Sequence, residues 1–196
     1  MAALHMRFRL STDELPTLPD YLAPGLDLVS IGINPSLPAA RAGFYFANPR
    51  NRFWPALNGS TLVGEVLEPG RAAMHRLHAH YGIGFSDVVK RPTAGAGDLR
   101  TADFRRDAPA LRAKLEAVRP RLLWFHGKLA AGQYLRHAHG WREPPVWGEQ
   151  PQPVLGARVM VTPNTSPANA SYSLAVLIQW FDRVAALRRA LASPPR

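Results

Sequence analysis

Residues 26–35 read LDLVSIGINP, the first of several short apolar stretches in the chain. Its first eight residues are mostly apolar and rich in β-branched side chains, and Asn34-Pro35 ends the run, a pattern that predicts a short buried strand at Leu26 to Ile33. Further extended segments of this kind are expected at residues 85–89, 121–125 and 158–162.

Helices are expected between these strands, because apolar residues recur there at spacings of three and four. Between residues 104 and 118, for example, Leu111, Leu115 and Val118 share one face, and Pro120 follows the end. The expected helices are residues 52–62, 71–80, 104–118, 128–135 and 174–191. Strands that alternate with helices predict an α/β fold, a three-layer α/β/α sandwich with a short, mainly parallel central sheet.

The loops that follow the strands are expected to form the functional site. In a parallel sheet the carboxyl ends of the strands lie at one edge, where ligands bind, so the loops after Ile33, Phe125 and Thr162 would meet there. The first of them, residues 34–51, is long for a loop inside a compact domain, which indicates a function.

The composition bounds the class of protein. The chain has 196 residues, 46% of them hydrophobic, enough for one domain that we place at residues 25–196, after an N-terminal extension of residues 1–24. There is no cysteine, which excludes disulfides, thiolate nucleophiles and zinc fingers. No apolar run reaches the roughly 18 residues of a membrane span, and no signal peptide is evident, so we expect a cytoplasmic protein without membrane contact.

The charge favours a polyanionic partner. Lys and Arg number 24 against 14 Asp and Glu, a formal net charge of +10. No carboxylate occurs from Leu28 to Gly64 or from Gln150 to Phe181, so these two segments can approach phosphates without repulsion. A GC-rich genome that encodes arginine in place of lysine would explain the many arginines as well, and composition does not separate the two explanations.

Several common catalytic motifs are missing. Gly127-Lys128 lacks the upstream glycine of a P-loop, and the GxG at residues 82–84 lacks the third glycine of a dinucleotide-binding motif. The three histidines at positions 75, 78 and 80 do not converge on a metal at that spacing, and no GxSxG elbow is present. A site made of amides, backbone groups and aromatic rings remains, for which we expect no metal and no cofactor.

Residues 32–57, GINPSLPAARAGFYFANPRNRFWPAL, resemble the first motif of the mismatch-specific uracil-DNA glycosylase family, the bacterial relatives of thymine-DNA glycosylase. GINP, GFxFAxP and NRFW occur in order and at the family's spacing. The chain is also similar to the family in KRPT at 90–93, WFHGK at 124–128 and VTPNTSPANAS at 161–171. The resemblance implies the uracil-DNA glycosylase fold and a monofunctional enzyme of base excision repair, which flips uracil and other damaged or 5-substituted pyrimidines out of DNA and leaves an abasic site.

The resemblance also assigns roles within the first motif. Asn34 holds the attacking water through its side-chain carbonyl, and Phe46 stacks on the flipped base. An amide takes up no proton, so Asn34 positions the water and is not a general base. Taken alone, Asn34 would more simply cap the turn before Pro35, and Phe46 would pack in the core. Further expected base contacts are Ile33, Ala39, Ala47 and Asn51, of which Asn51 equally fits a helix N-cap.

The chain departs from the family pattern at several positions. Ser36 replaces the last glycine of GINPG, and Ala39 stands where some members carry serine, which leaves room near the 5-position of the base. PANA at residues 167–170 replaces a Gly-Leu-Ser-Arg wedge that reads the opposite guanine. We therefore expect tolerance of 5-substituted uracils and weak discrimination by the opposite base.

Asp87 occupies a Lys-like position of the family, just before KRPT. A carboxylate at the rim of the sheet can activate the water or stabilise an oxocarbenium ion. It equally fits a helix cap or a surface ion pair with Lys90 or Arg91. The expected catalytic residues are thus Asn34 and Asp87.

The proposed partner is DNA that contains uracil or a mismatched or damaged pyrimidine, bound by a monomer associated with a bacterial nucleoid. Expected DNA contacts are Arg50, Arg52, Lys90, Arg91, Lys128, Asn164, Ser166, Pro167, Ala168 and Asn169. Each of these cations equally fits a solvated surface. Two alternatives stay open, a non-catalytic nucleic-acid-binding module with a degenerate cleft and a small-molecule nucleosidase.

Overall fold

The computed structural model describes residues 16–192, which fold around a five-stranded sheet in the order β2-β1-β3-β5-β4. Neighbouring strands are parallel except β4, which runs antiparallel to β5. The strands are β1 (Leu28–Gly32), β2 (Ile83–Asp87), β3 (Leu122–His126), β4 (Gly148–Glu149) and β5 (Arg158–Thr162). The predicted short and mainly parallel sheet is confirmed.

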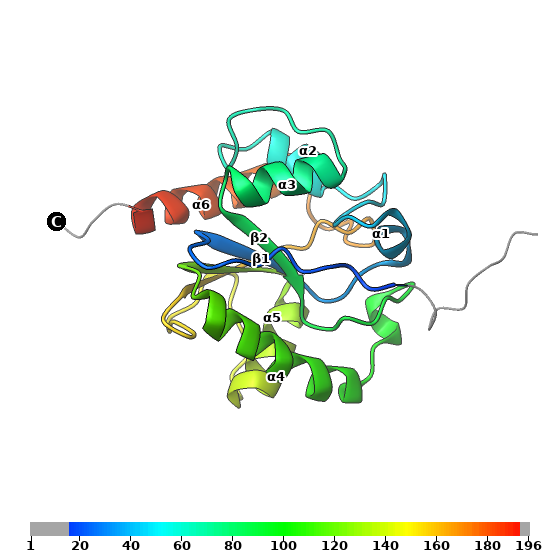
Figure 1. Ribbon diagram of the computed structural model, residues 1–196, viewed down its shortest axis with the longest axis vertical. Helices are drawn as coiled ribbons and strands as arrows, with labels where there is room; N and C mark the ends of the chain where they lie inside the picture. Colours follow the sequence, from blue (N-terminus) through cyan, green and yellow to red (C-terminus); the bar gives the residue numbers. More distant parts are fainter. Residues whose placement is uncertain (1–15, 193–196) are drawn as a thin grey trace, which may run out of the picture.

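Helices cover both faces of this sheet. Figure 1 shows α2, α3 and α6 on one face and α4 and α5 on the other, so the predicted three-layer sandwich is confirmed as well. The helices are α1 (Leu37–Ala42), α2 (Phe53–Asn58), α3 (Arg71–Ala79), the 3₁₀ turn η1 (Ala96–Asp98), α4 (Thr101–Val118), α5 (Lys128–His139) and α6 (Leu174–Ala192). None of the described helices is long and apolar enough to span a membrane.

The central strands β1, β3 and β5 are largely apolar because both of their faces are buried. In β3, Leu122 and Trp124 pack in the core under α2, α3 and α6, whereas Leu123 and Phe125 pack in the core over α4 and α5. Successive side chains of a strand point to opposite faces, so one short strand contributes to both cores.

The segment 34–51 was predicted as a loop, but it contains the short helix α1. The Ser36 Oγ accepts a hydrogen bond from the Ala39 N–H (3.3 Å), and Gly43 ends the helix at φ 73°. The serine that replaces the family's glycine is therefore the N-cap of this helix. A helix of only six residues, with Pro38 in its first turn, is too short to show a helical period in the sequence.

The edge of β2 is covered by residues 16–22. Leu18 is buried in the core, and Tyr21 forms an antiparallel bridge with Phe85. The Asp20 carboxylate accepts hydrogen bonds from the ammonium groups of Lys90 (2.8 Å) and Lys114 (2.6 Å). Of the expected N-terminal extension, residues 1–24, the first fifteen lie outside the described residues.

Candidate active site

The carboxyl ends of four strands bring small and polar residues into one row. Gly32 pairs with Asp87 across β1 and β2, and His126 pairs with Thr162 across β3 and β5. The register of β1 with β3 ends at Ile31 and Phe125, so Gly32 comes next to His126. This row faces the layer of α2, α3 and α6 and ends a sheet face that is mainly apolar apart from Ser30.

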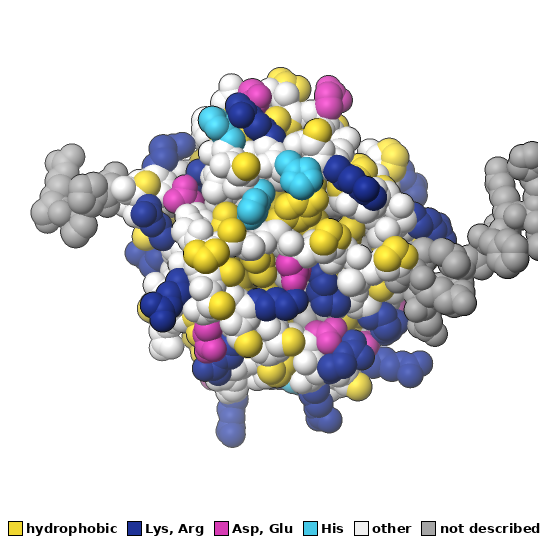
Figure 2. Space-filling view, viewed as in Figure 1, with side chains coloured by type: hydrophobic (Ala, Val, Ile, Leu, Met, Phe, Trp, Pro, Cys, Tyr) yellow, Lys and Arg dark blue, Asp and Glu magenta, His cyan; other side chains and the backbone are white. Residues whose placement is uncertain are grey.

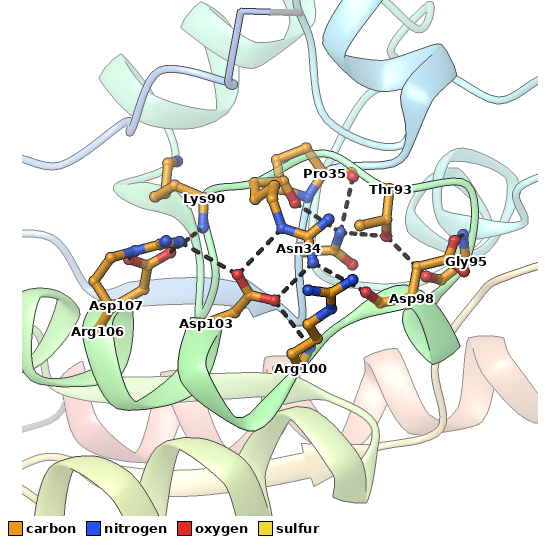
Figure 3. Close-up of polar contacts among 11 residues, drawn as sticks. Asn34, Pro35, Lys90, Thr93, Gly95, Asp98, Arg100, Asp103, Arg106 and Asp107 are labelled. Carbon is orange, nitrogen blue, oxygen red and sulfur yellow. Dashed lines mark hydrogen bonds and ion pairs between the residues drawn. The ribbon is translucent and has the colours of Figure 1, made fainter. Parts of the chain in front are cut away.

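Asn34 lies two residues beyond this row, with its amide nitrogen held by three acceptors. Its Nδ2 donates to the Thr93 Oγ1 (2.7 Å), the Arg91 carbonyl (3.0 Å) and the Pro35 carbonyl (3.2 Å) (Figure 3). Two of these groups are carbonyls that accept only, which fixes the orientation of the amide. None of the described residues donates a hydrogen bond to the Asn34 Oδ1, so this partly exposed oxygen is available to a water.

The segment that holds Asn34 is itself fixed by an ion pair. The Arg91 guanidinium donates to both Asp103 carboxylate oxygens (2.7 and 3.1 Å) and to the Asp98 carbonyl (2.9 Å). The hydrogen bonds from Arg91 lower the pKa of Asp103 to about 2. Thr93 donates its hydroxyl to the Gly95 carbonyl (2.8 Å) and therefore accepts from Asn34. The Asn34 amide thus rests on a pre-formed frame.

Phe46 packs over the same end of the sheet. Its ring stacks on Phe53, with centroids 3.9 Å apart and planes 8° from parallel, and it meets the His126 ring edge-on at 5.2 Å. Phe46 has a φ of 59°, a left-handed conformation that few non-glycine residues adopt and that often marks functional positions. Asn34 and Phe46 thus flank one row of residues, Asn34 beyond Gly32 and Phe46 against His126.

Asp87 is buried in this row, 4% exposed, and its Oδ2 has no hydrogen-bond partner among the described residues. Burial raises the pKa of Asp87 to about 7, a rise that the nearby Lys90 opposes. A Cβ atom at Gly32 would come within 2.5 Å of the Asp87 Oδ1, so the carboxylate needs the glycine opposite it. A buried carboxylate with one unpaired oxygen and a pKa near neutrality is typical of a functional acid or base.

His126 is the site residue that the sequence analysis missed. Its Nε2 lies 2.7 Å from the Ser30 Oγ, and its Nδ1 is buried with no hydrogen-bond partner in the described part of the chain. Burial lowers the pKa of His126 to about 3, so the ring is neutral at pH 7. The available signal was a lone polar residue at the end of the apolar run LLWFH.

The sequence profile of the uracil DNA glycosylase superfamily matches residues 19–190. The chain belongs to the uracil DNA glycosylase superfamily. A solution NMR structure from Methanosarcina acetivorans, of a protein provisionally assigned as a uracil DNA glycosylase, is similar with a TM-score of 0.61. It is 22% identical, and the match covers 91% of this chain and 99% of that one. The superfamily supports a DNA glycosylase, a hydrolase of N-glycosidic bonds.

The other expected base contacts differ in burial. Ile33 and Ala47 are partly buried, and Ala39 is buried in α1. The Asn51 Oδ1 accepts a hydrogen bond from the Phe53 N–H (2.9 Å) at the start of α2. This is a turn contact just before α2, whose N-cap is Arg52 and has no side-chain capping hydrogen bond. The substrate contact of Asn51 stays a prediction.

The loop after β5 is held by Arg52. The Arg52 guanidinium donates to three loop carbonyls, those of Ser166 (3.1 Å), Asn169 (2.6 Å) and Tyr172. The Asn169 side chain turns back to donate to the Asn164 carbonyl (2.9 Å), whereas Pro167 and Ala168 are exposed. The exposed tip of this loop is therefore Pro167-Ala168.

The remaining expected cations divide into two groups. Lys90 forms an ion pair with Asp20 and Arg91 with Asp103, so both charges are already engaged within the fold. Arg50 and Lys128 are exposed, and the Lys128 Nζ lies 5.0 Å from the centre of the Trp147 ring.

The face over α3 and α4 carries more basic than acidic side chains, and its histidines gather over α3 (Figure 2). His75 and His78 pack edge-on against Tyr21. Within residues 16–192, no three His, Asp or Glu side chains are placed to hold a metal ion.

Proposed function

We propose that the chain is a monofunctional DNA glycosylase that flips uracil out of DNA and hydrolyses its N-glycosidic bond. The observation that carries this proposal is the Asn34 amide, whose nitrogen is held by three acceptors while its oxygen is left for a water. The aromatic ring of Phe46 lies over the same end of the sheet, and the unpaired carboxylate of Asp87 is buried there.

In the proposed reaction the flipped pyrimidine stacks on Phe46, whose ring is backed by Phe53. A water bound to the Asn34 Oδ1 attacks C1′ as the N1–C1′ bond breaks and oxocarbenium character develops. The carboxylate of Asp87 stabilises this positive charge and takes the proton that the water loses when the O–C1′ bond forms. The pair of electrons of the broken bond leaves with the base as a pyrimidine anion.

The leaving base needs hydrogen-bond donors. We place the backbone N–H groups near Ile33 and Ala47 at its carbonyls, where such donors stabilise developing charge by about 3–4 kcal/mol. The neutral ring of His126 lies beside Phe46, and its Nδ1 donates when the Ser30 hydroxyl donates to Nε2. His126 is therefore proposed to face the polar edge of the flipped base.

The finer specificity follows the resemblance to the mismatch-specific group. Ala39 leaves room for 5-substituted uracils, and the exposed tip Pro167-Ala168 replaces a wedge that ends in arginine. We propose excision of 5-hydroxymethyluracil together with uracil, at rates that differ little between U·G, U·A and single strands. A strong preference for U·G in a kinetic panel would contradict this specificity.

The proposed DNA surface keeps Arg50, Lys128 and the tip Pro167-Ala168 as direct contacts. Lys90, Arg91 and Arg52 act instead by holding loops, since their charged groups are engaged within the fold. Direct phosphate contacts steepen the dependence of binding on salt by about one unit per contact. Replacement of Arg50 is thus expected to reduce that slope, and replacement of Arg91 to reduce activity through Asn34.

The test is an excision assay with a fluorescent duplex that contains one uracil, followed by alkali. Strand breakage is expected with the natural chain and a loss of about 10²-fold or more with Asn34→Ala. The control Asn58→Ala removes an amide that holds Leu67 instead and is expected to keep the activity. Binding of the duplex without breakage would identify a binding module, and neither binding nor breakage would leave the nucleosidase.

A further inference from the structure

The β4 edge of the sheet carries a second aromatic surface, separate from Phe46. Trp147 is 38% exposed, Tyr172 meets its ring edge-on at 6.1 Å, and the Lys128 Nζ lies 5.0 Å from the ring centre. We call Trp147, Tyr172 and Lys128 the Trp147 platform. These residues come from the turn before β4, the loop before α6 and the first position of α5, so the fold brings together three distant segments.

The turn that presents Trp147 is rigid. The buried Gln150 side chain accepts from the Val146 N–H (3.0 Å) and donates to the carbonyls of Val146 (2.8 Å) and Gly148 (3.0 Å). Gly148 has a φ of 92° and pairs with Val161 at the edge of the sheet. A tryptophan held outward on such a turn presents a flat apolar surface. It loses little conformational entropy when a ligand binds.

Apolar exposure concentrates around this platform. Among the described residues, five large hydrophobic side chains are exposed, and four of them adjoin it in sequence or belong to it. They are Leu129, Val146, Trp147 and Leu174. Leu129, Val146 and Leu174 lie within two residues of Lys128, Trp147 and Tyr172 in the sequence, so the exposed apolar side chains gather on the segments that form the platform.

The charge around the platform selects the occupant. No carboxylate occurs from Gln150 to Phe181. Of the two acidic residues nearest to Trp147 in the sequence, Glu149 is paired with Arg158 and Glu143 is exposed. An aromatic ring with a cation over it, in a chain of net charge +10, is complementary to a nucleobase on a phosphate backbone. We propose that the Trp147 platform stacks an unpaired base of single-stranded DNA, an inference that rests on the proposed function for DNA as the partner.

The platform lies at the same carboxyl-end edge of the sheet as the proposed reaction, but away from it. β4 is three strand spacings from β1, about 14 Å at 4.8 Å each, and Trp147 stands at the carboxyl-end edge because Gly148 pairs with Val161. At this separation Trp147 stacks another base of the strand and not the flipped one.

The test measures binding of a uracil-free dT 12-mer and a uracil-free 12-base-pair duplex by fluorescence anisotropy at fixed salt. Trp147→Leu is expected to weaken single-strand binding roughly 5- to 100-fold and duplex binding less than about threefold, because it removes stacking and keeps apolar bulk. Trp147→Phe is expected to retain most of the affinity. Val66→Ala, which removes another exposed hydrophobic residue, is expected to change neither.

Other outcomes overturn the proposal. Equal losses on single strand and duplex mean a contact to the backbone, and unchanged affinities mean no nucleic-acid contact at Trp147. A dimer in sedimentation that Trp147→Leu abolishes assigns the platform to a second copy of the chain. These readouts need no excision, so failure of the proposed hydrolysis and failure of the platform are distinguishable.

Discussion

Replacement of Asp87 by asparagine is expected to stabilise the fold at high pH and to slow excision. The buried carboxyl has its pKa raised from 3.8 to about 7, and each unit corresponds to about 1.4 kcal/mol. The rise of about three units therefore amounts to about 4 kcal/mol. The unfolded chain releases this proton near pH 4 while the folded chain keeps it, so the Asp87 protein loses stability as pH rises from 4 to 7.

The difference between variant and natural protein isolates this effect. Asparagine does not titrate, and its amide brings a buried NH₂ without a partner at a cost of about 1–3 kcal/mol that does not change with pH. Other titrating groups are common to both proteins and cancel. The stability of Asp87→Asn relative to the natural chain is thus expected to rise by about 4 kcal/mol between pH 4 and pH 8, measured by urea unfolding.

The rate of excision reports the same ionisation of Asp87. Ionisation lowers the stability of the fold but raises the rate of excision. The ionised carboxylate is the reactive form, so the single-turnover rate of the natural protein rises up to about pH 7 and then levels, while Asp87→Asn is slow at every pH. A stability difference that stays constant with pH would refute the buried, raised pKa. An Asp87→Asn protein with unchanged rate would remove Asp87 from the mechanism and leave the Asn34 argument intact.

Three further predictions concern the frame of the site. Gly32→Ala places a methyl group 2.5 Å from the Asp87 Oδ1. It is expected to lower the free energy of unfolding in urea by about 1–3 kcal/mol and to slow excision. The control Gly97→Ala, which has open space around it, is expected to change neither. Arg52→Lys removes the forked contact to three loop carbonyls. It is expected to raise KM for DNA more than it lowers kcat and to speed amide hydrogen exchange in residues 164–172. Exchange rates equal to those of the natural chain would count against this role. Asp103→Asn is expected to weaken the ion pair with Arg91 and to lower Tm at pH 7. The difference in Tm is expected to disappear as pH falls from 4 to 2, because the pKa of Asp103 is about 2 in the fold. A Tm difference that persists at pH 2 would contradict this.

The layers of the fold could be predicted because burial leaves a direct mark on the sequence. Each central strand is a largely apolar run, and the long helices α4 and α6 repeat apolar residues at helical spacing. The short helix α1 was not predicted, since six residues with a proline show no helical period. The strand β4 was not predicted either, because it has only two residues and its pairing with β5 depends on the turn at Gly148.

The site was predictable only in part, because side-chain partners are set by tertiary contacts. A linear motif indicated Asn34 and Phe46 but not the acceptors that orient the amide, which lie 57 and 59 residues away. Arg52 and Arg91 were expected on DNA, and the structure instead engages them with loop carbonyls and with Asp103. His126 carries no local signal beyond its place at the end of a strand, and its neutral, unpaired state follows from burial alone.

The central claim is that a flipped pyrimidine lies against Phe46 with a water on the Asn34 oxygen. The most direct measurement is a crystal structure of the natural chain bound to a single strand with one 2′-fluoro-deoxyuridine, whose N-glycosidic bond resists hydrolysis. A water is expected within about 3 Å of the Asn34 Oδ1. We expect the uracil ring parallel to Phe46 at stacking distance, with its polar edge within about 3 Å of the His126 Nδ1 and its C1′ facing Asp87. A uracil that stays outside the row of Asp87, Gly32 and His126 would contradict this binding mode.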